Sequence, residues 1–254
     1  MDDPTVDTSH RPWPLPDGPW VMAQTWNDLL FAHWPVETEA IRALVPPALT
    51  LDRYADTAWV TITPFHISDL HARGLPTLPW GAKFPELNVR TYVTLGGKPG
   101  VFFFSLDAGD PLAVTAARAL YHLPYFRASM DVRRTADEVV YHSRRTHAGA
   151  PEAEFRARYR ATGDVASPDP NTLDHWLTER YCLYAVAASD HVYRAEIHHR
   201  PWSLQPAIAD IHLNTMAAAA GIALPAQPPR VSYARRLEVV VWLPQRLDVA
   251  AGPS

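Results

Sequence analysis

The segment ELNVRTYV at residues 86–93 alternates strictly between two kinds of side chain. Its odd positions are Leu, Val, Thr and Val, and its even positions are Glu, Asn, Arg and Tyr. A period of two predicts a β-strand with one apolar face and one polar-aromatic face. The GGKPG run at residues 96–100 is a dense turn signal, and Val101–Asp107 has the character of a return strand. The chain is therefore built around an antiparallel hairpin.

Strand-like segments dominate the rest of the sequence. Helical spacing or composition and suitable end signals predict only three helices, at Thr38–Val45, Pro111–His122 and Asn171–Arg180, the last capped by its first or second residue. The other predicted strands are Ala58–Ile67, Tyr125–Arg134, Glu138–Arg145, Ala153–Ala161, Tyr181–Ala187, His191–His198, Ala207–Asn214 and Ser232–Leu243. Most neighbours are joined by short turns. The fold class that follows is α+β, mostly antiparallel β, with a few short helices.

The length and composition favour one globular domain over residues 1–254, with a core at about 11–243 and flexible termini. The chain has 254 residues, of which 47% are hydrophobic and 20% charged, and all-β barrels of this size are often undivided. The net charge is −4 and the basic residues are scattered, so we expect no nucleic-acid partner.

Cysteine usage and hydropathy restrict the compartment. Cys182 is the single cysteine, which excludes an internal disulfide and a thiolate-based zinc site. Residues 1–17 carry acids and prolines where a secretory signal has a basic and then an apolar stretch. No apolar run approaches the roughly 20 residues that cross a bilayer. We expect a cytoplasmic protein without a membrane partner, and the missing GxGxxG and P-loop motifs indicate no nucleotide cofactor.

Several segments carry a family resemblance. The stretch EAIRALVPPALTLD at 39–52 and the long stretch from Phe84 to Met130 resemble acetoacetate decarboxylase-like proteins in element order. The segments WNDLLFAHWPV, LTERYCLYA and AEIHHRPWSLQ resemble the uncharacterised DUF2071 (YqjF-like) family of that superfamily more narrowly. The similarity runs from about Arg11 to Leu243. It implies a cone-like acetoacetate decarboxylase-like β-barrel whose interior holds a small carbonyl or carboxylate compound.

One departure from the superfamily pattern bears on the reaction. Its decarboxylases form a Schiff base on a lysine just after the proline of a bend, where a neighbouring cation and desolvation lower the lysine pKa. Here Tyr125 occupies the lysine position and Phe126 that of the cation. The chain has two lysines: Lys98 lies in the Gly/Pro turn, and Lys83 is expected in an exposed loop. Schiff-base decarboxylation is therefore not expected.

The polar face of the alternating strand supplies the first candidate site. Glu86, Asn88 and Arg90 share it, and in a barrel with helices packed outside they would line the interior. Glu86 corresponds by resemblance to the superfamily's pocket carboxylate and is a candidate general acid or base, while Asn88 and Arg90 are candidate substrate-binding groups. The alternative is structural: Glu86 and Arg90 form an ion pair in the barrel wall.

The bend itself supplies the second candidate site. Tyr125 could donate a hydrogen bond to an enolate or carboxylate, His122 could exchange a proton near neutral pH, and Arg127 could hold a carboxylate. The alternative makes Tyr125 a half-buried strand aromatic and His122 a helix C-terminal residue favoured by the helix dipole. The sequence favours neither interpretation.

Three further side chains complete the predicted binding set: Trp59, His66 and His198. His66, His198 and His212 could also converge with Glu86 or Glu196 on a metal ion, but no HExxH or other tight ligand spacing occurs. We therefore expect no metal and no other cofactor, and hydrogen-bonding or structural roles for these histidines.

Two functions remain open at this point. The first is a small-molecule enzyme acting on an organic acid or carbonyl compound, with a carboxylate as the expected ligand. The second is a non-catalytic binding or sensing domain that kept the pocket without the lysine. Exposed strands at barrel edges also make a homo-oligomer plausible.

Overall fold

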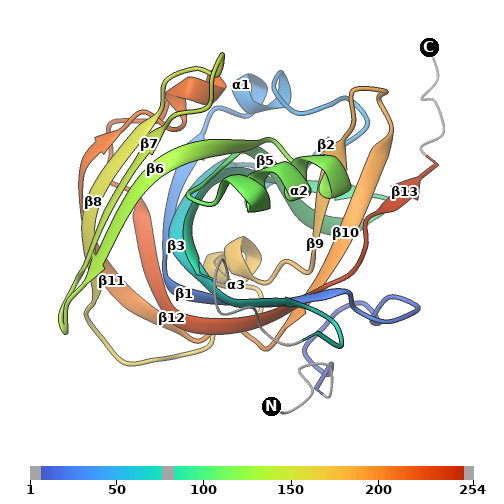
Figure 1. The fold of residues 1–254 in the computed structure, drawn as a ribbon, viewed down its shortest axis with the longest axis horizontal. Coiled ribbons are helices and arrows are strands. Elements are labelled where there is room, and N and C mark those ends of the chain that lie inside the picture. The colour runs from blue at the N-terminus through green and yellow to red at the C-terminus, as the bar shows by residue number, and fades with distance from the viewer. Residues whose placement is uncertain (1–6, 76–82, 249–254) are drawn as a thin grey trace.

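Strand β4 (Phe84–Leu95) is buried along both of its faces, although only one of them is apolar. In a sheet at the protein surface, each strand has one face packed on the core and one face in solvent. A strand that is buried on both faces, as β4 is, must therefore lie inside the molecule. The computed structural model, which describes residues 7–75 and 83–248, shows how the sheet encloses it (Figure 1).

The described residues form mainly strands, as the sequence predicted. The helices are α1 (Thr38–Arg42), α2 (Pro111–Tyr121) and α3 (Leu173–Thr178), with a short 3-10 turn at Ala218–Ala220. Besides β4, the strands are β1 (Met22–Val36), β2 (Thr50–Leu51), β3 (Ala58–Ala72), β5 (Lys98–Ala108), β6 (Tyr125–Arg134), β7 (Val139–Arg145), β8 (Glu154–Ala161), β9 (Cys182–Val186), β10 (Val192–His199), β11 (Leu204–Asn214), β12 (Arg230–Val241) and β13 (Gln245–Leu247).

Nine strands close into a barrel, in the order β5-β6-β7-β8-β11-β12-β1-β3-β4. The predicted fold class and barrel are therefore confirmed. Two strands of this barrel, β5 and β12, also pair with strands outside it. Strand β5 pairs with β6 near its end and with β9 near its start, and β12 pairs with β11 in its first half and with β10 in its last residues. Through β9 and β10 a second ring closes on the same wall, β12-β1-β3-β4-β5.

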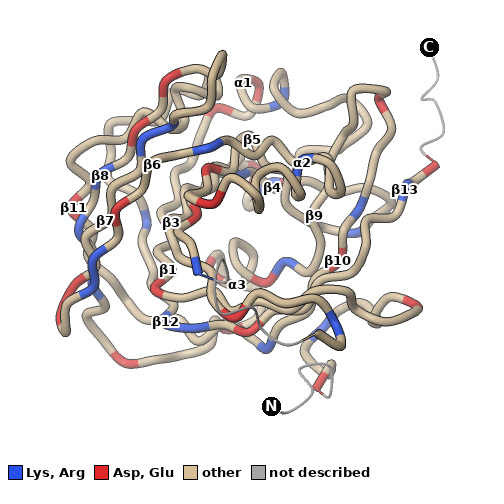
Figure 2. Tube along the Cα trace, in the orientation of Figure 1, with Lys and Arg blue, Asp and Glu red and all other residues tan. Residues whose placement is uncertain are grey.

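The shared wall separates two compartments. On one side, apolar side chains such as Leu87 and Val89 join the largest hydrophobic cluster, which β7 and β8 cover with Tyr141 and Phe155. On the other side, Glu86, Asn88 and Arg90 border a cavity. The strict alternation of β4 thus places consecutive residues in a filled and a hollow compartment. The outer strands β6, β7, β8 and β11 carry interspersed acidic and basic residues (Figure 2).

Strand β1 is the longest element that the sequence pattern did not predict. It pairs with β12 on one edge and with β3 on the other, so it lies in the middle of the wall. Burial on both faces removes the polar-apolar alternation that marks a half-exposed strand. A positive φ of 50° at Asp28 also reverses the side-chain parity, so that Trp26 and Phe31 both face the cavity.

The helices were expected outside the barrel, and α2 corrects that expectation. Its side chains Ala113, Ala117 and Tyr121 line the cavity, and α2 lies across the front of the second ring (Figure 1). Asp110 caps its start by accepting hydrogen bonds from the backbone N–H groups of the second and third helical residues, at 2.8 and 3.0 Å. Within residues 7–75 and 83–248, none of the helices has the length and hydrophobicity that crossing a bilayer requires.

The environment of Lys98 corrects a second expectation. Gly96 and Gly97, with φ of 58° and 77°, make the hairpin turn alone, so Lys98 already belongs to β5. Its ammonium group pairs with the buried carboxylate of Glu196, and its side chain is only 11% exposed. Lys83 is exposed, as expected, and neither lysine lines the cavity.

Candidate functional site

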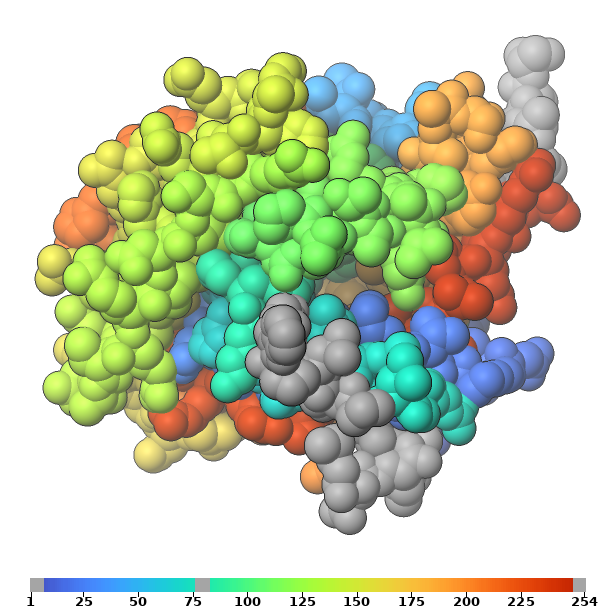
Figure 3. Space-filling model, viewed as in Figure 1, coloured from blue at the N-terminus to red at the C-terminus, as the bar shows by residue number. Residues whose placement is uncertain are grey.

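The cavity lies inside the second ring, between the shared wall, α2 and the strands β9 and β10. Its volume is about 220 Å³, well above the ~10–15 Å³ that a single water molecule needs. Figure 3 shows the surface hollowed beside α2. Most lining side chains are apolar, among them Leu29, Phe65, Phe103, Leu106 and Trp202. A mostly apolar pocket with a few polar groups is typical of a small-molecule site.

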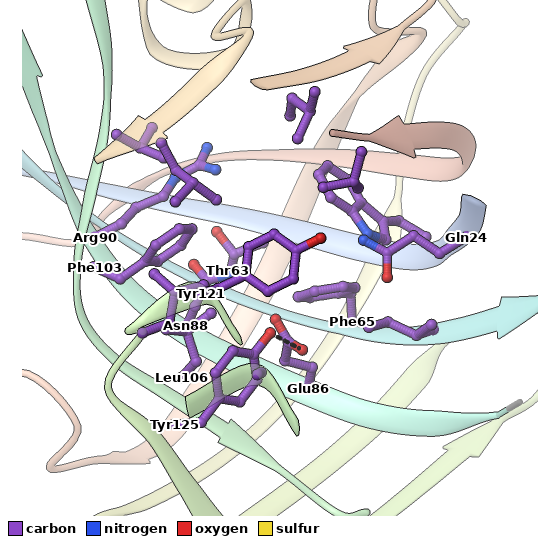
Figure 4. Close-up of a pocket in the computed structure, with 18 of the residues that line it drawn as sticks. Gln24, Thr63, Phe65, Glu86, Asn88, Arg90, Phe103, Leu106, Tyr121 and Tyr125 are labelled. Atoms are coloured by element: carbon purple, nitrogen blue, oxygen red, sulfur yellow. Dashed lines mark hydrogen bonds between the residues drawn. The ribbon is translucent and has the colours of Figure 1, made fainter. Parts of the chain in front are cut away.

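Glu86 and Tyr125 form a hydrogen-bonded pair in this cavity. The Tyr125 hydroxyl donates to Glu86 Oε2 at 2.9 Å (Figure 4). β4 positions the carboxyl group, and β6 positions the tyrosine directly after the bend at Pro124. The structure therefore brings together two predicted site residues that are 39 positions apart. One oxygen of Glu86 is left for other contacts.

Burial changes the ionisation of this pair. Loss of solvent raises the pKa of Glu86 from 4.5 to about 8, the hydrogen bond from Tyr125 opposes the rise, and the nearby charge of Asp107 adds to it. Burial and the Glu86 carboxyl together raise the pKa of Tyr125 well above its ordinary value. At pH 7 Glu86 is therefore mainly a neutral carboxylic acid, and Tyr125 keeps its proton.

Arg90 lies on the same face of β4 and is 8% exposed. Its guanidinium group lies 5.3 Å from the centroid of the Phe31 ring and 6.0 Å from that of Tyr92. Its Nε and Nη2 atoms are buried and make no hydrogen bond of normal geometry to a described residue, and the Tyr92 side chain is its polar neighbour. Arg90 and Glu86 therefore form no ion pair in the wall, in contrast to the structural alternative. Asn88 also lines the cavity, and its Oδ1 is buried without a described partner.

The structure places the other residues of the bend away from the cavity. His122 follows the last residue of α2 in a left-handed conformation and is exposed. The centroid of its ring lies 4.5 Å from that of Tyr193. Arg127 is exposed on β6. The bend at Pro124 lies between His122 and Tyr125, and the local sequence did not show in which direction it turns the chain.

The remaining predicted binding residues also lie outside the cavity lining. Trp59 packs beside the cluster around Tyr92, and its carbonyl accepts a hydrogen bond from Thr91. His66 lies 3.9 Å from Asp28 in a separate surface groove. His198 faces the N-terminal segment, where Arg11 Nη1 lies 3.4 Å from its Nδ1. Among residues 7–75 and 83–248, no group of three or more His, Cys, Asp or Glu is placed to hold a metal.

Sequence reasoning missed several polar residues that line the cavity, among them Gln24, Thr63, Arg180 and His199. The alternation of β10 indicated that His199 faces away from His198, but not which of the two faces a pocket. His199 Nδ1 lies 2.7 Å from the carbonyl of Arg200, and burial lowers the His199 pKa, so the ring is neutral and its Nε2 is an acceptor. Arg180 follows α3, and no local pattern marked it.

The comparisons with known proteins identify the family of this chain. Residues 23–238 match the family DUF2071, described as an uncharacterized conserved protein. The uncharacterized protein YqjF of Bacillus subtilis (strain 168) is 49% identical over 228 residues, which cover 90% of this chain and 93% of YqjF. Neither description states a reaction.

Two solved structures share the fold at low sequence identity. The enduracididine biosynthesis enzyme MppR, complexed with the condensation product of pyruvate and imidazole 4-carboxaldehyde, superimposes with a TM-score of 0.66, 10% identity and 92% coverage of both chains. Acetoacetate decarboxylase from Legionella pneumophila gives a TM-score of 0.61 and 12% identity, with 94% of this chain and 93% of that chain covered. At these identities the likeness establishes the acetoacetate decarboxylase-like fold alone.

Proposed function

Since this chain belongs to the DUF2071 family, we propose that it is a small-molecule enzyme that acts on an organic acid or carbonyl compound by acid–base catalysis. The observation that carries the proposal is the hydrogen bond of 2.9 Å from Tyr125 to Glu86 inside the cavity. A titratable group with a strongly shifted pKa in an enclosed pocket is a typical feature of an active site.

The pair can move one proton. In its carboxylate form Glu86 removes a proton from the carbon beside the carbonyl group of a bound compound; the C–H electron pair forms the C=C bond of an enolate, and the carbonyl π electrons move onto oxygen. The neutral Glu86 then acts as an acid and returns a proton, or a deuteron taken up from solvent, to that carbon, while the hydrogen bond from Tyr125 stabilises the carboxylate form. A pKa of about 8 makes Glu86 an acid below that pH and a base above it. Arg90 holds the carboxylate of the compound.

The reaction proceeds without a lysine Schiff base in this proposal. Tyr125 takes the place where the superfamily's decarboxylases carry the lysine, and neither Lys83 nor Lys98 lines the cavity. A phenol whose pKa is raised well above its ordinary value is a hydrogen-bond donor and a poor nucleophile at neutral pH. The proposal is therefore limited to proton transfer and electrostatic stabilisation.

The test is turnover of a panel of oxo acids, hydroxy acids and simple carbonyl compounds, followed by proton NMR in deuterium oxide. We expect at least one compound to exchange a C–H proton or to form a product. Glu86→Gln should reduce that rate by about 100-fold or more, as expected for loss of a general acid. Arg144→Gln, at an exposed site on β7, is the control. A rate that is equal in wild type and Glu86→Gln contradicts the proposal.

A binding or sensing domain is the second candidate. The observation that favours it is the absence of a lysine nucleophile from a cavity whose lining is mostly apolar. Such a domain would bind one metabolite and leave it unchanged. Tight binding of a compound in the same NMR samples, without exchange or product in wild type, would favour this function over catalysis.

A further inference from the structure

Two other arginines of this protein show how the Nε and Nη2 atoms of an arginine bind one carboxylate. Arg145 donates from Nε and Nη2 to the two carboxylate oxygens of Asp107, at 2.8 and 2.7 Å. Arg230 uses the same two atoms on Asp174, at 2.6 Å each. Arg90 belongs to the cavity lining, its Nε and Nη2 atoms are buried without a hydrogen bond of normal geometry, and the Tyr92 side chain lies beside it. A carboxylate next to Arg90 would supply the acceptors that these N–H groups lack.

A second arginine reaches the same end of the cavity. Arg180 donates from Nη1 to Asp52 at 2.6 Å and from Nε to the carbonyl of Trp176 at 2.7 Å, while its Nη2 is buried without a described partner. Its guanidinium group lies 5.0 Å from the Tyr92 ring centroid, and that of Arg90 lies 6.0 Å from the same centroid. Both guanidinium groups therefore lie near the same aromatic ring, and each has buried N–H groups without a described acceptor.

The charges at this end leave one positive charge unbalanced. Asp52 balances Arg180. Arg90 has no carboxylate partner among the described residues, and Glu86, with a pKa of about 8, is mainly neutral at pH 7. His33 is buried beside Arg90, and burial and that positive charge hold its pKa well below its ordinary value, so it is neutral. A ligand with a single negative charge would restore neutrality, and burying an uncompensated charge is costly without one.

The anion end and the Glu86 end are far apart. Four residues along a strand separate the Cα atoms of Glu86 and Arg90 by about 13 Å, at about 3.3 Å per residue. Figure 4 shows the Arg90 guanidinium group on the opposite side of the pocket from the Glu86 and Tyr125 pair. Phe103, Thr63 and Asn88 lie between them in that view. A short 2-oxo or 3-oxo acid has its carbonyl beside its carboxylate or one carbon away, so we expect such an acid to reach only one of the two ends.

We propose that the ligand is an elongated monocarboxylic acid, with its carboxylate between Arg90 and Arg180. Its carbonyl or hydroxyl group, several carbons away, lies at Glu86 and Tyr125; this second part rests on the proposed function. The apolar lining around Phe65, Phe103 and Leu106 contacts the carbon chain between the two ends.

The first test uses wild-type protein and compounds that cannot react. Straight-chain saturated acids from butanoate to dodecanoate, and the alcohols of equal length, are titrated by calorimetry. We expect octanoate to bind at least about tenfold more tightly than butanoate, because its longer carbon chain buries more methylene groups against the apolar lining. We expect octan-1-ol to bind at least about tenfold more weakly than octanoate, since it lacks the charge. Butanoate binding as tightly as octanoate, or the alcohol binding as tightly as the acid, overturns the proposal.

The second test assigns the carboxylate to the two arginines. Arg90→Gln and Arg180→Gln should each weaken octanoate binding by about tenfold or more, because a hydrogen bond to a charged group is lost. Binding of octan-1-ol should stay unchanged, as should octanoate binding to the control Arg144→Gln. Circular dichroism checks the fold of each variant, and Arg180→Lys, which keeps the charge opposite Asp52, replaces Arg180→Gln if that variant unfolds. Full octanoate affinity in both cavity variants overturns the assignment.

The two proposals can fail separately. If octanoate binds with the expected length and arginine dependence but no oxo or hydroxy acid of that length is turned over, catalysis is contradicted and the ligand class stands. If a short acid is turned over in a Glu86-dependent reaction that Arg180→Gln leaves unchanged in both kcat and KM, catalysis stands and the elongated ligand is wrong.

Discussion

Glu86 and Leu87 are consecutive residues of β4, and they lie on opposite sides of the wall that the two rings share. Leu87 belongs to the filled compartment and is fully buried, whereas Glu86 borders the hollow one. One strand therefore serves stability with one face and the candidate site with the other. Substitutions at the two positions should separate these contributions.

Leu87→Ala should destabilise the protein and spare the pocket. Truncation of a fully buried leucine removes apolar contacts and leaves a cavity, which costs about 2 to 5 kcal/mol. Urea unfolding monitored by tryptophan fluorescence measures the loss. Octanoate affinity of the folded variant, at low urea, should match wild type. A loss of less than about 1 kcal/mol would contradict the assignment of Leu87 to a well-packed core.

Glu86→Gln should change how stability depends on pH. The folded pKa of Glu86 is about 8 and its ordinary value is 4.5, so the folded state binds the proton more tightly. The stabilisation from that proton is fully present below pH 4.5 and is lost as pH rises through about 8. At 1.36 kcal/mol per pKa unit, the loss is at most about 5 kcal/mol. Urea unfolding at pH 5, 6.5 and 8.5 should show this fall in wild type and a flatter profile in Glu86→Gln.

Tyr125→Phe should raise the pKa of Glu86 further. The tyrosine hydroxyl donates to the carboxylate and so opposes the effect of burial, and its removal eliminates that stabilisation of the charged form. A hydrogen bond to a charged group contributes about 1.5 to 3 kcal/mol, which corresponds to about one to two pKa units. Carbon-13 NMR titration of labelled glutamate measures the shift. Tyr121→Phe, in the same cavity, should leave the titration unchanged; an unmoved pKa in Tyr125→Phe refutes the hydrogen bond.

Arg90→Met should make the empty protein more stable and the pocket unable to bind acids. Arg90 is a buried cation without a described carboxylate partner, and an apolar side chain of similar length avoids the cost of taking that uncompensated charge out of water. Thermal unfolding with and without octanoate measures both effects. We expect a higher Tm without ligand and no further rise with it. A lower ligand-free Tm together with a retained octanoate shift would show that Arg90 has a structural partner.

Arg127→Ala and His122→Ala should leave acid binding unchanged. Both side chains are exposed and lie outside the cavity lining, although the sequence placed them in the candidate site. Calorimetric titration of octanoate into each variant is the measurement, with Arg90→Met as the variant that loses binding. A change of more than about threefold in either would mean that the bend moves toward the cavity when ligand binds.

The sequence by itself determined the local elements and the shared face of Glu86, Asn88 and Arg90. Strand alternation, helix caps and Gly turns act over a few residues, so their signals can be read directly in the chain. The resemblance to acetoacetate decarboxylase-like proteins added the barrel and the expectation that Tyr125 occupies the lysine position. The local elements were predicted from residues close together in the sequence, and the barrel and the lysine position were predicted from the family pattern.

Only the tertiary structure decided which strand faces enclose a cavity and which residues from distant segments complete its lining. The wall strand β1 is buried on both faces and reverses its parity at Asp28, so it carries no alternation to detect. Arg180 and His199 reach the pocket because β9 and β10 close a ring between β5 and β12. Ring closure depends on contacts between segments far apart in the chain, and the burial that raises the Glu86 pKa exists only after that closure.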